Sequence, residues 1–442
     1  MKKNYDVIII GAGITGLTAA RDLVKAGKTV CIVEADSQGG GLASTFLLND
    51  EIEIEKFYHH WFNSDQYIMS LINELKLANL VTSVATNTGL YFNKRIWKLS
   101  SPVDLLRFKA LSFVDRIRLG LLVFKVKRIK DWRELENLSI RDWLEPLSGA
   151  KVYEIVWEPL IKAKFANFAT EISAVWMWKK LDLRGGTRQR RGAEELLYMR
   201  GGFNVLIKRL MEEIESNGGT INLSCAAIKF QFEGTAISSL KTQSETITAQ
   251  EYIVTTAFPI ANKLVESYTD TKWKDSLARV NYLGNICLVL RLRHSLSNTY
   301  WLNVNDPEFP FVGVIEHTNF EDESNYANSH IVYLSRYIST QDKDWEMNDE
   351  KYFENAFKNL NRMFPKLDRN WIIEYKIWRA EYSQPVVEKN YSSYLPRKIT
   401  PISNLMLSNM AHIYPEDRGT NFAVRDGKEI ARIALERISR KV

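Results

Sequence analysis

The sequence predicts an α/β protein whose first part is a Rossmann-type dinucleotide-binding domain. Three observations predict it: an apolar, β-branched run at Tyr5–Ile10, a glycine-rich turn directly after it, and a second apolar run at Thr29–Val33. A helix-like stretch that ends at about Ala26 joins the two runs. Strand, helix and strand in this order form the βαβ unit of doubly wound folds.

The turn and the end of the second strand carry the residues that a dinucleotide needs. Gly11 permits a tight turn, Gly13 lets the backbone approach a diphosphate, and Gly16 packs the helix against the strand. The N-terminus of the helix then points its free N–H groups at the phosphates. Glu34 ends the second strand, where a carboxylate accepts hydrogen bonds from a ribose and favours NAD or FAD over NADP. The dinucleotide contacts predicted in this unit are Gly11, Ala12, Gly13, Thr15, Gly16 and Glu34.

The composition is that of a globular protein with more than one domain. The 442 residues exceed one ordinary core, and the hydrophobic and charged contents of 45% and 25% are typical of globular chains. The chain runs from Met1 directly into a strand and has no uncharged apolar run long enough to span a membrane. We therefore expect a cytoplasmic protein without a signal peptide. A net charge of +6 is too mild to indicate a nucleic-acid partner.

The cysteines give no sign of a metal centre or a disulfide framework. Cys31, Cys225 and Cys287 lie far apart, each inside a strand-like segment. Their spacing matches neither zinc ligands nor paired cysteines. We expect buried thiols in a reducing compartment and predict no metal site.

One segment concentrates positive charge. Between Arg107 and Lys130 the chain carries eight Lys or Arg residues against the single acid Asp115, interleaved with apolar residues. Such a segment suits contact with an anionic membrane surface. An ordinary packed helix with a solvated basic rim explains the same pattern, because the charges do not fall on one clean helical face.

Further elements follow in chain order. A glycine cluster at Gly39–Thr45 predicts a loop close to a ligand, since neither a helix nor a strand tolerates it. The strand Ile52–Phe57 then delivers Tyr58, His59 and His60 to its end. The pattern is mostly helical over residues 64–180, and Asp182–Ala193 is predicted to be a basic, glycine-rich linker.

The second half of the chain returns to the nucleotide fold. It contains a helix that opens at Met199–Phe203 and ends near Ser216, a strand at Thr220–Cys225 and a strand-rich stretch ending at Tyr252–Thr256. β-Branched strands around Leu288, Val312 and Val332 predict a second sheet. A buried strand at Leu405–Ser408 leads to a final helix from about Ala423. The dinucleotide domain is therefore expected to be discontinuous.

This order of elements resembles the FAD-dependent amine oxidase, protoporphyrinogen oxidase and phytoene desaturase superfamily. Four blocks carry the resemblance: Gly11–Glu34, Gly39–Ser44, Arg200–Gly202 with the following helix and strand, and Asn404–Gly427. The resemblance implies FAD rather than NAD. It also implies an FAD-binding domain from residues 1–65, 194–262 and 395–442, and an α+β substrate domain from residues 66–193 and 263–394.

The resemblance also implies cofactor contacts outside the first βαβ unit. These are Gly40, Gly41, Leu42 and Ala43 in the glycine loop, Ala227 beside the adenine, Met410 after the late strand, and Gly419, Thr420, Asn421 and Ala423 near the flavin. The chain departs from the family at two of these places. Leu42 stands where the family has an arginine, and Asn409 and Met410 replace the acid that commonly follows the late strand.

Candidate catalytic residues are those that the strands present to a flavin ring. Tyr58, His59 and His60 follow the strand that the superfamily brings to the flavin, and a histidine can act as acid or base near neutral pH. The alternative is that one histidine packs and the other bonds to backbone. Tyr382 and Gln384 share one face of a strand that passes over the ring in the superfamily, and we predict that this face is the flavin side.

Further polar residues are candidates for substrate contact. Glu316 and His317 end an apolar strand. We expect them either to line the substrate pocket or to cap a loop. Arg418 either neutralises charge on a reduced flavin or substrate, or pairs with Asp417. The arginines of the Asp182–Ala193 segment, Arg188 among them, either grip a phosphate or belong to a solvated loop.

The function expected from these features is FAD-dependent oxidation. A flavin accepts a hydride, and the protein positions the substrate and moves a proton. The basic segments favour an amphiphilic, phosphorylated or lipid-linked small molecule, met at the inner face of the membrane. The alternative is a non-redox flavin enzyme similar to UDP-galactopyranose mutases, which act on nucleotide sugars. A third hypothesis is a flavin-binding partner without catalysis.

Overall fold

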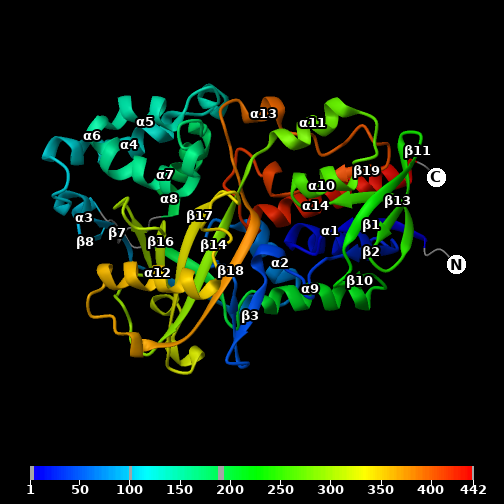
Figure 1. Ribbon diagram of the computed structural model, residues 1–442. Helices are drawn as coiled ribbons and strands as arrows, with labels where there is room; N and C mark the ends of the chain where they lie inside the picture. The colour runs from blue at the N-terminus through cyan, green and yellow to red at the C-terminus, as the bar shows by residue number, and fades with distance from the viewer. Residues whose placement is uncertain (1–3, 99–101, 188–193, 441–442) are drawn as a thin grey trace.

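The computed structural model describes residues 4–98, 102–187 and 194–440 (Figure 1). It is a mixed α/β structure with two large sheets, so the predicted α/β class is confirmed. The sheet that contains the strand Asn4–Ile10 lies on one side of the molecule. The second sheet and a group of helices lie on the other. Within the described part of the chain, no helix combines the length and the apolarity needed to cross a membrane.

The first sheet has a parallel centre whose strands come from distant parts of the chain. Its strand order is β10-β2-β1-β13-β12-β11, and β19 pairs in parallel with β13. Val30–Val33 and the last four residues of Asn4–Ile10 are buried, as parallel strands covered by helices are. The strands are β1 (Asn4–Ile10), β2 (Val30–Val33), β10 (Thr220–Asn222), β11 (Ala227–Glu233), β12 (Ala236–Thr242), β13 (Thr246–Val254) and β19 (Leu405–Leu407).

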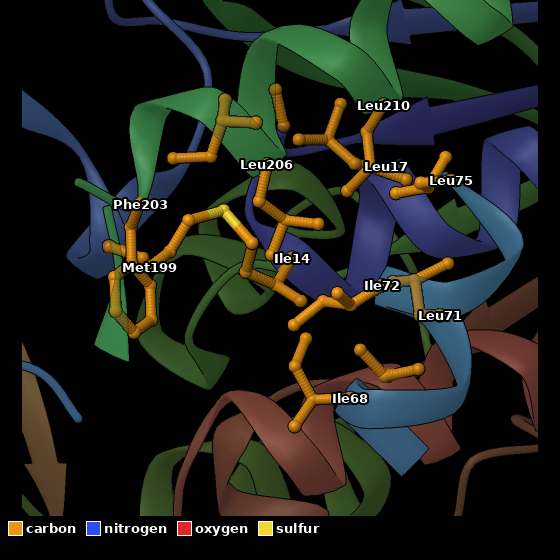
Figure 2. Close-up of a cluster of buried hydrophobic side chains, with 14 of the residues drawn as sticks. Ile14, Leu17, Ile68, Leu71, Ile72, Leu75, Met199, Phe203, Leu206 and Leu210 are labelled. Atoms are coloured by element: carbon orange, nitrogen blue, oxygen red, sulfur yellow. The ribbon is translucent and has the colours of Figure 1, made fainter. Parts of the chain in front are cut away.

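The helices that pack together beside this sheet also come from distant segments. They are α1 (Ile14–Lys25), α2 (Gln66–Glu74), α9 (Asn204–Ser216) and α14 (Thr420–Ser439). Figure 2 shows their apolar side chains meeting in one cluster that includes Ile14, Leu17, Ile68, Leu71 and Leu206. Helices α10 (Phe258–Leu264) and α11 (Thr271–Arg279) follow β13. Cys31, Cys225 and Cys287 are buried.

The second sheet has the order β18-β14-β17-β16-β15-β7-β8, and the apolar side of α12 packs on it. A small sheet pairs β5, β9 and β6, and a hairpin joins β3 and β4. These strands and α12 are β3 (Thr45–Leu48), β4 (Ile52–Glu55), β5 (Trp61–Phe62), β6 (Val81–Thr86), β7 (Thr88–Phe92), β8 (Arg95–Lys98), β9 (Glu194–Met199), β14 (Tyr282–Leu292), β15 (Trp301–Val304), β16 (Gly313–Glu316), β17 (His330–Ile338), α12 (Asp349–Met363) and β18 (Ile372–Pro385).

A lobe of helices occupies the middle of the first half of the chain (Figure 1). Its members are α3 (Pro102–Arg107), α4 (Phe113–Arg128), α5 (Ile140–Ser148), α6 (Ala150–Val152), α7 (Glu158–Phe165) and α8 (Ala174–Thr187). Two sequence predictions are wrong here. Residues 81–98 form three strands rather than helix, because β6 and β7 find partners in β9 and β15, far away in sequence. Helix α8 extends to Thr187, so the first part of the predicted linker is helical.

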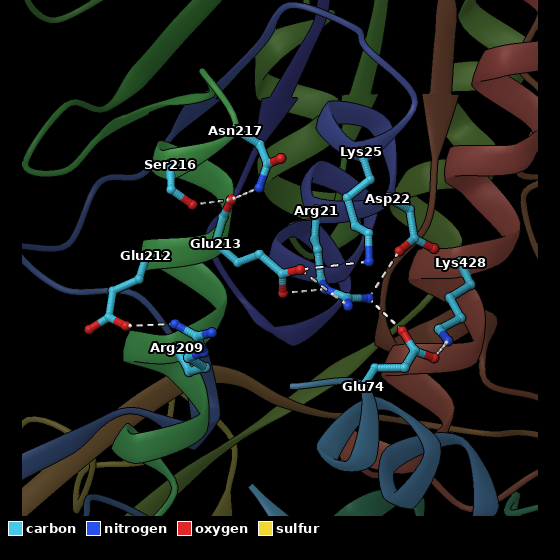
Figure 3. A network of polar contacts seen from close by, with 10 residues as sticks. All are labelled: Arg21, Asp22, Lys25, Glu74, Arg209, Glu212, Glu213, Ser216, Asn217 and Lys428. Atoms are coloured by element: carbon cyan, nitrogen blue, oxygen red, sulfur yellow. Dashed lines mark hydrogen bonds and ion pairs between the residues drawn. The ribbon is translucent and has the colours of Figure 1, made fainter. Parts of the chain in front are cut away.

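A charge network around the buried side chain of Arg21 joins the four helices beside the first sheet (Figure 3). The side chain of Arg21 on α1 is only 1% exposed and donates to Glu213 on α9 and to Glu74 on α2, both at 2.7 Å. Lys428 on α14 reaches Glu74 at 2.7 Å. Burial opposes the ionisation of Glu74, but the hydrogen bonds from Lys428 and Arg21 outweigh it and lower the pKa to about 2. The network fixes the helix arrangement that the apolar cluster alone leaves less specific.

Replacing Arg21 by Met should destabilise the protein by about 2 kcal/mol, because Glu74 and Glu213 lose the buried cation between them and keep only the more exposed Lys428 and Lys25. Urea unfolding of the FAD-loaded protein measures this. Since the pKa of Glu74 is depressed, the network's contribution is present above pH 4.5 and is lost as the pH falls toward 2, so the two proteins should converge there. Arg432→Met breaks an exposed pair with Glu436 and is the control, expected to cost less than about 0.5 kcal/mol. Equal losses in both variants would contradict the role of burial.

Candidate functional site

The glycine turn after β1 is packed too closely to accept side chains at two positions. Gly11 has a φ of +106°, and a Cβ there would lie 2.7 Å from the Thr255 hydroxyl oxygen. A Cβ on Gly16 would lie 2.0 Å from the carbonyl oxygen of Gly11. Gly13 differs, since among the described residues no atom lies within 4 Å of a Cβ built there. Gly11 and Gly16 are therefore required by the packing of the fold, whereas Gly13 borders open space.

The second glycine loop is attached to the first. The N–H of Gly40 donates to the carbonyl of Ala12 at 2.7 Å, and the φ of Gly40 is +108°. A Cβ on Gly41 would lie 3.4 Å from the Cα of Gly13, so the two backbones are in contact. Ala43 is buried behind this loop. The structure therefore brings together two loops that the sequence predicted to lie beside one ligand.

The N-terminus of α1 is available for an anion. Gly13 is its N-cap and, among the described residues, no side chain caps the helix or places an acid in its first turn, which includes Thr15. Its first N–H groups thus lack intrahelical acceptors and face the open side of Gly13. These features fit a diphosphate.

Glu34 lies at the same edge of the sheet. One oxygen of its carboxylate accepts from the Ala12 N–H at 2.7 Å and the other accepts from the Asp36 N–H at 2.9 Å. Each oxygen has a further lone pair for a ribose hydroxyl. Ala227 begins β11 two residues after Cys225, whose N–H donates to the Glu34 carbonyl, so the adenine candidate lies near the ribose candidate.

A cavity of about 270 Å³ adjoins the N-terminus of α14. Gly419, Thr420 and Asn421 line it on one side and Leu42 lines it from the glycine loop. The side chains of Thr420 and Asn421 already have protein partners. Trp61 Nε1 donates to Thr420 Oγ1 at 2.7 Å, and Asn421 Oδ1 accepts from two backbone N–H groups at the start of α2. Ala423 lies in the first turn of α14, where its N–H donates to the Gly419 carbonyl.

The two predicted histidines line this cavity and have different hydrogen-bond partners. His59 Nδ1 lies 2.6 Å from the carbonyl oxygen of Phe57, and since a carbonyl only accepts, Nδ1 carries the proton and Nε2 is an acceptor. Burial lowers the pKa of His59 to about 4, so the ring is neutral at pH 7. His60 Nδ1 lies 3.0 Å from the Tyr300 hydroxyl, and its ring meets Trp301 edge-on.

Tyr58 completes the predicted set. Its ring packs edge-on against Trp301 at 4.9 Å between centroids and against Tyr333 at 6.1 Å. Burial raises the pKa of Tyr58 well above its usual value, so its hydroxyl keeps the proton. Tyr58, His59 and His60 are thus brought together at one wall of the cavity.

Three cationic side chains also line the cavity. Arg418 donates from Nε to Gln384 at 2.7 Å and from Nη2 to the Tyr337 hydroxyl at 2.8 Å. Lys180 on α8 pairs with Asp417, and Lys164 on α7 lies 4.9 Å from the centre of the Tyr337 ring. The sequence singled out Arg418 but missed both lysines, since no local pattern marks a lysine whose partners are distant in the chain.

The acids near these cations only partly balance them. Burial raises the pKa of Asp417, but the charges of Lys180, Lys164 and Arg418 outweigh it and keep the pKa below its usual value. Asp417 is therefore ionised. Burial raises the pKa of Asp65 to about 6, so its carboxyl is a weak acid. The cavity lining thus carries three cationic side chains and two acidic ones, of which Asp65 ionises only above about pH 6.

Two buried polar atoms at the cavity wall are unsatisfied. Asn285 donates to Ser335 Oγ at 2.9 Å, yet its Oδ1 has no partner among the described residues. The same holds for the buried hydroxyl of Ser383. Buried polar groups are normally bonded, so orphans at a cavity wall indicate the place of a ligand.

Tyr382, predicted to face the flavin, does not line the cavity. Its ring packs against Tyr282, at 5.6 Å between centroids, while Ser383 lines the cavity. The strict alternation fails because β18 bulges here. Only Gly284 separates Leu283 from Asn285 on β14, whereas three residues separate their partners Gln384 and Ala380 on β18. Gln384 still reaches the site through Arg418.

Glu316 and His317 do not line the cavity. The Glu316 carboxylate accepts from Ser295 and from the N–H groups of Leu296 and Ser297, so it organises a loop. His317 is buried against the Tyr326 hydroxyl at 2.6 Å, and burial lowers its pKa to about 3. Of the alternatives left open by the sequence, these contacts favour the loop cap.

The remaining site candidates differ in their contacts. Asp417 and Arg418 do not pair with each other, because each has another partner. Met410 places its sulfur 3.8 Å from Arg418 Nη1. Arg188 lies outside the described residues.

Comparisons with known proteins agree with this geometry. A family model described as flavin-containing amine oxidoreductase matches residues 14–435. A zeta-carotene desaturase from Synechocystis sp. is 22% identical over 456 residues, which cover 91% of this chain and 91% of the relative. A solved structure assigned as a protoporphyrinogen oxidase from Exiguobacterium sp. 255-15 has a TM-score of 0.78 at 16% identity and covers 99% of both chains. Reduced UDP-galactopyranose mutase has a TM-score of 0.77 at 16% identity and covers 99% of this chain and 94% of the other.

The family match identifies the cofactor as FAD and confirms the superfamily resemblance seen in the sequence. The two structural likenesses, at this low identity, show the fold. The uncapped α1 terminus, the open side of Gly13 and Glu34 are the features of this chain that fit the adenosine diphosphate part of FAD.

Gly13→Ala should weaken FAD binding by about tenfold or more while leaving the fold intact, because its Cβ meets open space in the protein but enters the diphosphate's approach. FAD titration of the apoprotein and its unfolding midpoint measure the two effects separately. Gly16→Ala should instead destabilise the fold, since its Cβ meets backbone. Gly120→Ala in α4 is the neutral control. Unchanged FAD affinity in Gly13→Ala would place the diphosphate elsewhere.

Proposed function

The chain belongs to the flavin-containing amine oxidoreductase family and is an FAD-dependent oxidoreductase, and on that premise we propose that its substrate is an organic molecule bearing an anionic group. The substrate would lie in the cavity between Tyr58–His60 and the N-terminus of α14. The proposed anionic group is a carboxylate or a phosphate.

The observation that carries this proposal is the convergence of Lys164, Lys180 and Arg418 on one cavity wall. Three cationic side chains against the carboxyls of Asp417 and Asp65 leave the lining with net positive charge, which attracts an anion and repels a protonated amine where water is displaced. The Arg418 guanidinium is held by Gln384 and Tyr337, which orients it for a planar or phosphate anion. An anionic substrate is therefore favoured over the amines for which the family is described.

The rest of the cavity favours an amphiphilic substrate. Its other walls include the rings of Phe57, Tyr300, Trp301 and Phe422. Aromatic surface binds the apolar part of a ligand, and the cations bind its charged part. Phosphorylated or lipid-linked molecules combine both parts, and we propose this class.

Bound FAD supplies the acceptor for a hydride from the substrate. In the proposed mechanism, Arg418 and Lys164 hold the anionic group and the orphan Oδ1 of Asn285 accepts a hydrogen bond from a substrate hydroxyl or amine. His59 presents a neutral Nε2 that orients a donor, since a base of pKa about 4 holds a proton poorly. His60, bonded to Tyr300, is the proposed proton acceptor. Tyr58 and the tryptophan beside it exclude water.

This proposal includes a division of the chain. We propose that residues 1–65, 194–262 and 395–442 form the FAD-binding domain and that residues 66–193 and 263–394 form the substrate domain. The cavity lining supports it, since Leu42 and Gly419 come from the first set, and Lys164, Asn285 and Tyr337 come from the second.

A second candidate function is non-redox flavin chemistry on a nucleotide sugar. The cationic wall also suits a diphosphate, and the fold resembles that of UDP-galactopyranose mutase. The two functions differ in one observable. An oxidoreductase loses its yellow colour when substrate is added without oxygen, whereas a mutase turns over on reduced flavin with no net redox change.

Anaerobic screening should find anionic or phosphorylated compounds that bleach the flavin. With such a compound, Arg418→Gln and Lys164→Gln should each lower kcat/KM by about tenfold or more, mainly through KM, because a charge contact to the substrate is lost. Lys162→Gln is the matched control, since Lys162 lies on the same helix and pairs with Glu158 in solvent. Bleaching by cationic amines alone would sink the proposal.

His59→Gln and His60→Gln should keep bound FAD but slow its reduction, by about 100-fold for His60. Because the pKa of His59 is about 4, its ring stays neutral from pH 5 upward, and the reduction rate should show no inflection from this group between pH 5 and 8. Stopped-flow absorbance, recorded from pH 5 to 8, measures the rate of flavin reduction in each variant and the pH dependence of that rate. An inflection near pH 6.5 that disappears in His59→Gln would contradict the burial argument.

A further inference from the structure

In the described part of the chain, the exposed large apolar side chains concentrate on α3 and α4 of the helical lobe, whose position Figure 1 shows. Phe113 is 61% exposed and Phe124 is 65% exposed. Of the thirteen large apolar side chains that are exposed in the described part of the chain, seven lie here: Val103, Leu106, Phe113, Val114, Ile117, Leu121 and Phe124. The concentration of these side chains on 22 residues distinguishes this surface from scattered exposed residues, which need no explanation.

These side chains form a continuous stripe. Phe113, Ile117, Leu121 and Phe124 follow at intervals of four, four and three residues, which places them on one face of α4. The opposite face is the one that packs. Leu122 and Val126 are buried in the core. Helix α4 therefore has two apolar sides, of which the protein covers one.

Basic side chains surround the stripe. Arg107 and Lys109 lie between α3 and α4, and Lys127, Arg128 and Lys130 lie at the other end of α4, all exposed. Between residues 107 and 130 the only acid is Asp115, which accepts from the Ser112 hydroxyl and pairs with Arg118. Exposed basic side chains thus bound the stripe at both ends, and α3 carries one acid, Asp104.

We propose that the surface of α3 and α4 docks on an anionic lipid bilayer. Apolar side chains that enter the acyl boundary, flanked by Lys and Arg at the headgroup level, are the two components of interfacial binding. A protein partner fits less well, because lysine is depleted at protein interfaces. A second copy fits poorly, since a two-fold contact would set one strongly basic segment against another. The proposal stands apart from the proposed substrate and does not depend on it.

The test is co-sedimentation of the FAD-loaded protein with vesicles at low salt. Vesicles that contain about one-third phosphatidylglycerol should bind the protein, vesicles of phosphatidylcholine alone should bind it about tenfold less, and high salt should release it. Phe113→Ser with Phe124→Ser should reduce binding about tenfold, and Lys127→Gln with Arg128→Gln should do so as well. Ile228→Ser with Ile399→Ser, two exposed apolar residues elsewhere, is the matched control and should bind as the parent does.

A second measurement keeps the test independent of the double variants. A single Phe124→Cys protein, labelled with an environment-sensitive dye, should brighten on anionic vesicles, because the native cysteines are buried. The same label at Ile228→Cys should not respond. The proposal fails if anionic vesicles do not bind the protein at low salt, or if the control pair loses binding equally. It also fails if the phenylalanine variants abolish a concentration-dependent dimer in sedimentation velocity, which would assign the surface to a second copy.

Discussion

The structure depends on the contact between two glycine loops at the carboxyl edge of the first sheet. Gly16 approaches the carbonyl of Gly11 so closely that no Cβ fits, and Gly40 donates to Ala12 across the gap between the loops. Parallel strands end at a common edge, so this contact gathers chain segments that are far apart in sequence. Backbone rather than side chains therefore forms the wall on which a dinucleotide rests. The cavity at the N-terminus of α14 continues that wall.

The charges of the cavity follow from the same arrangement. Lysines from α7 and α8 line the cavity with Arg418, and Lys180 pairs with Asp417. Burying charged groups costs free energy, and such groups are commonly gathered where a ligand binds. The Oδ1 of Asn285 and the hydroxyl of Ser383, which have no hydrogen-bond partner among the described residues, also indicate that a ligand binds there. Two of the unsatisfied buried side-chain atoms in the described residues thus lie at the cavity wall, where a ligand can reach them.

Sequence reasoning succeeded where the determinants are local. The βαβ unit needs only strand periodicity, glycine spacing and an acid at a fixed place, and β1, α1 and β2 lie within a few residues of the predicted positions. It failed where contacts with segments distant in the sequence determine the local structure. Residues 81–98 become strands because β9 and β15 pair with β6 and β7. Tyr382 leaves the predicted face because a bulge in β18 breaks alternation, and Lys164 and Lys180 reach the cavity only through the packing of the helical lobe.

Helix α8 links the outer surface of the helical lobe to its interior. It carries Lys180 at the cavity, and Trp178 on the same helix donates to the Val126 carbonyl of α4 at 3.3 Å. Packed helices lie about 10 Å apart, so one layer of helix separates the apolar stripe of α4 from the cations of the cavity. A change on the buried side of α4 would therefore disturb both the surface and the cavity. Only substitutions on the exposed side, at positions such as Phe113 and Phe124, can test the proposed membrane contact without changing the proposed substrate site.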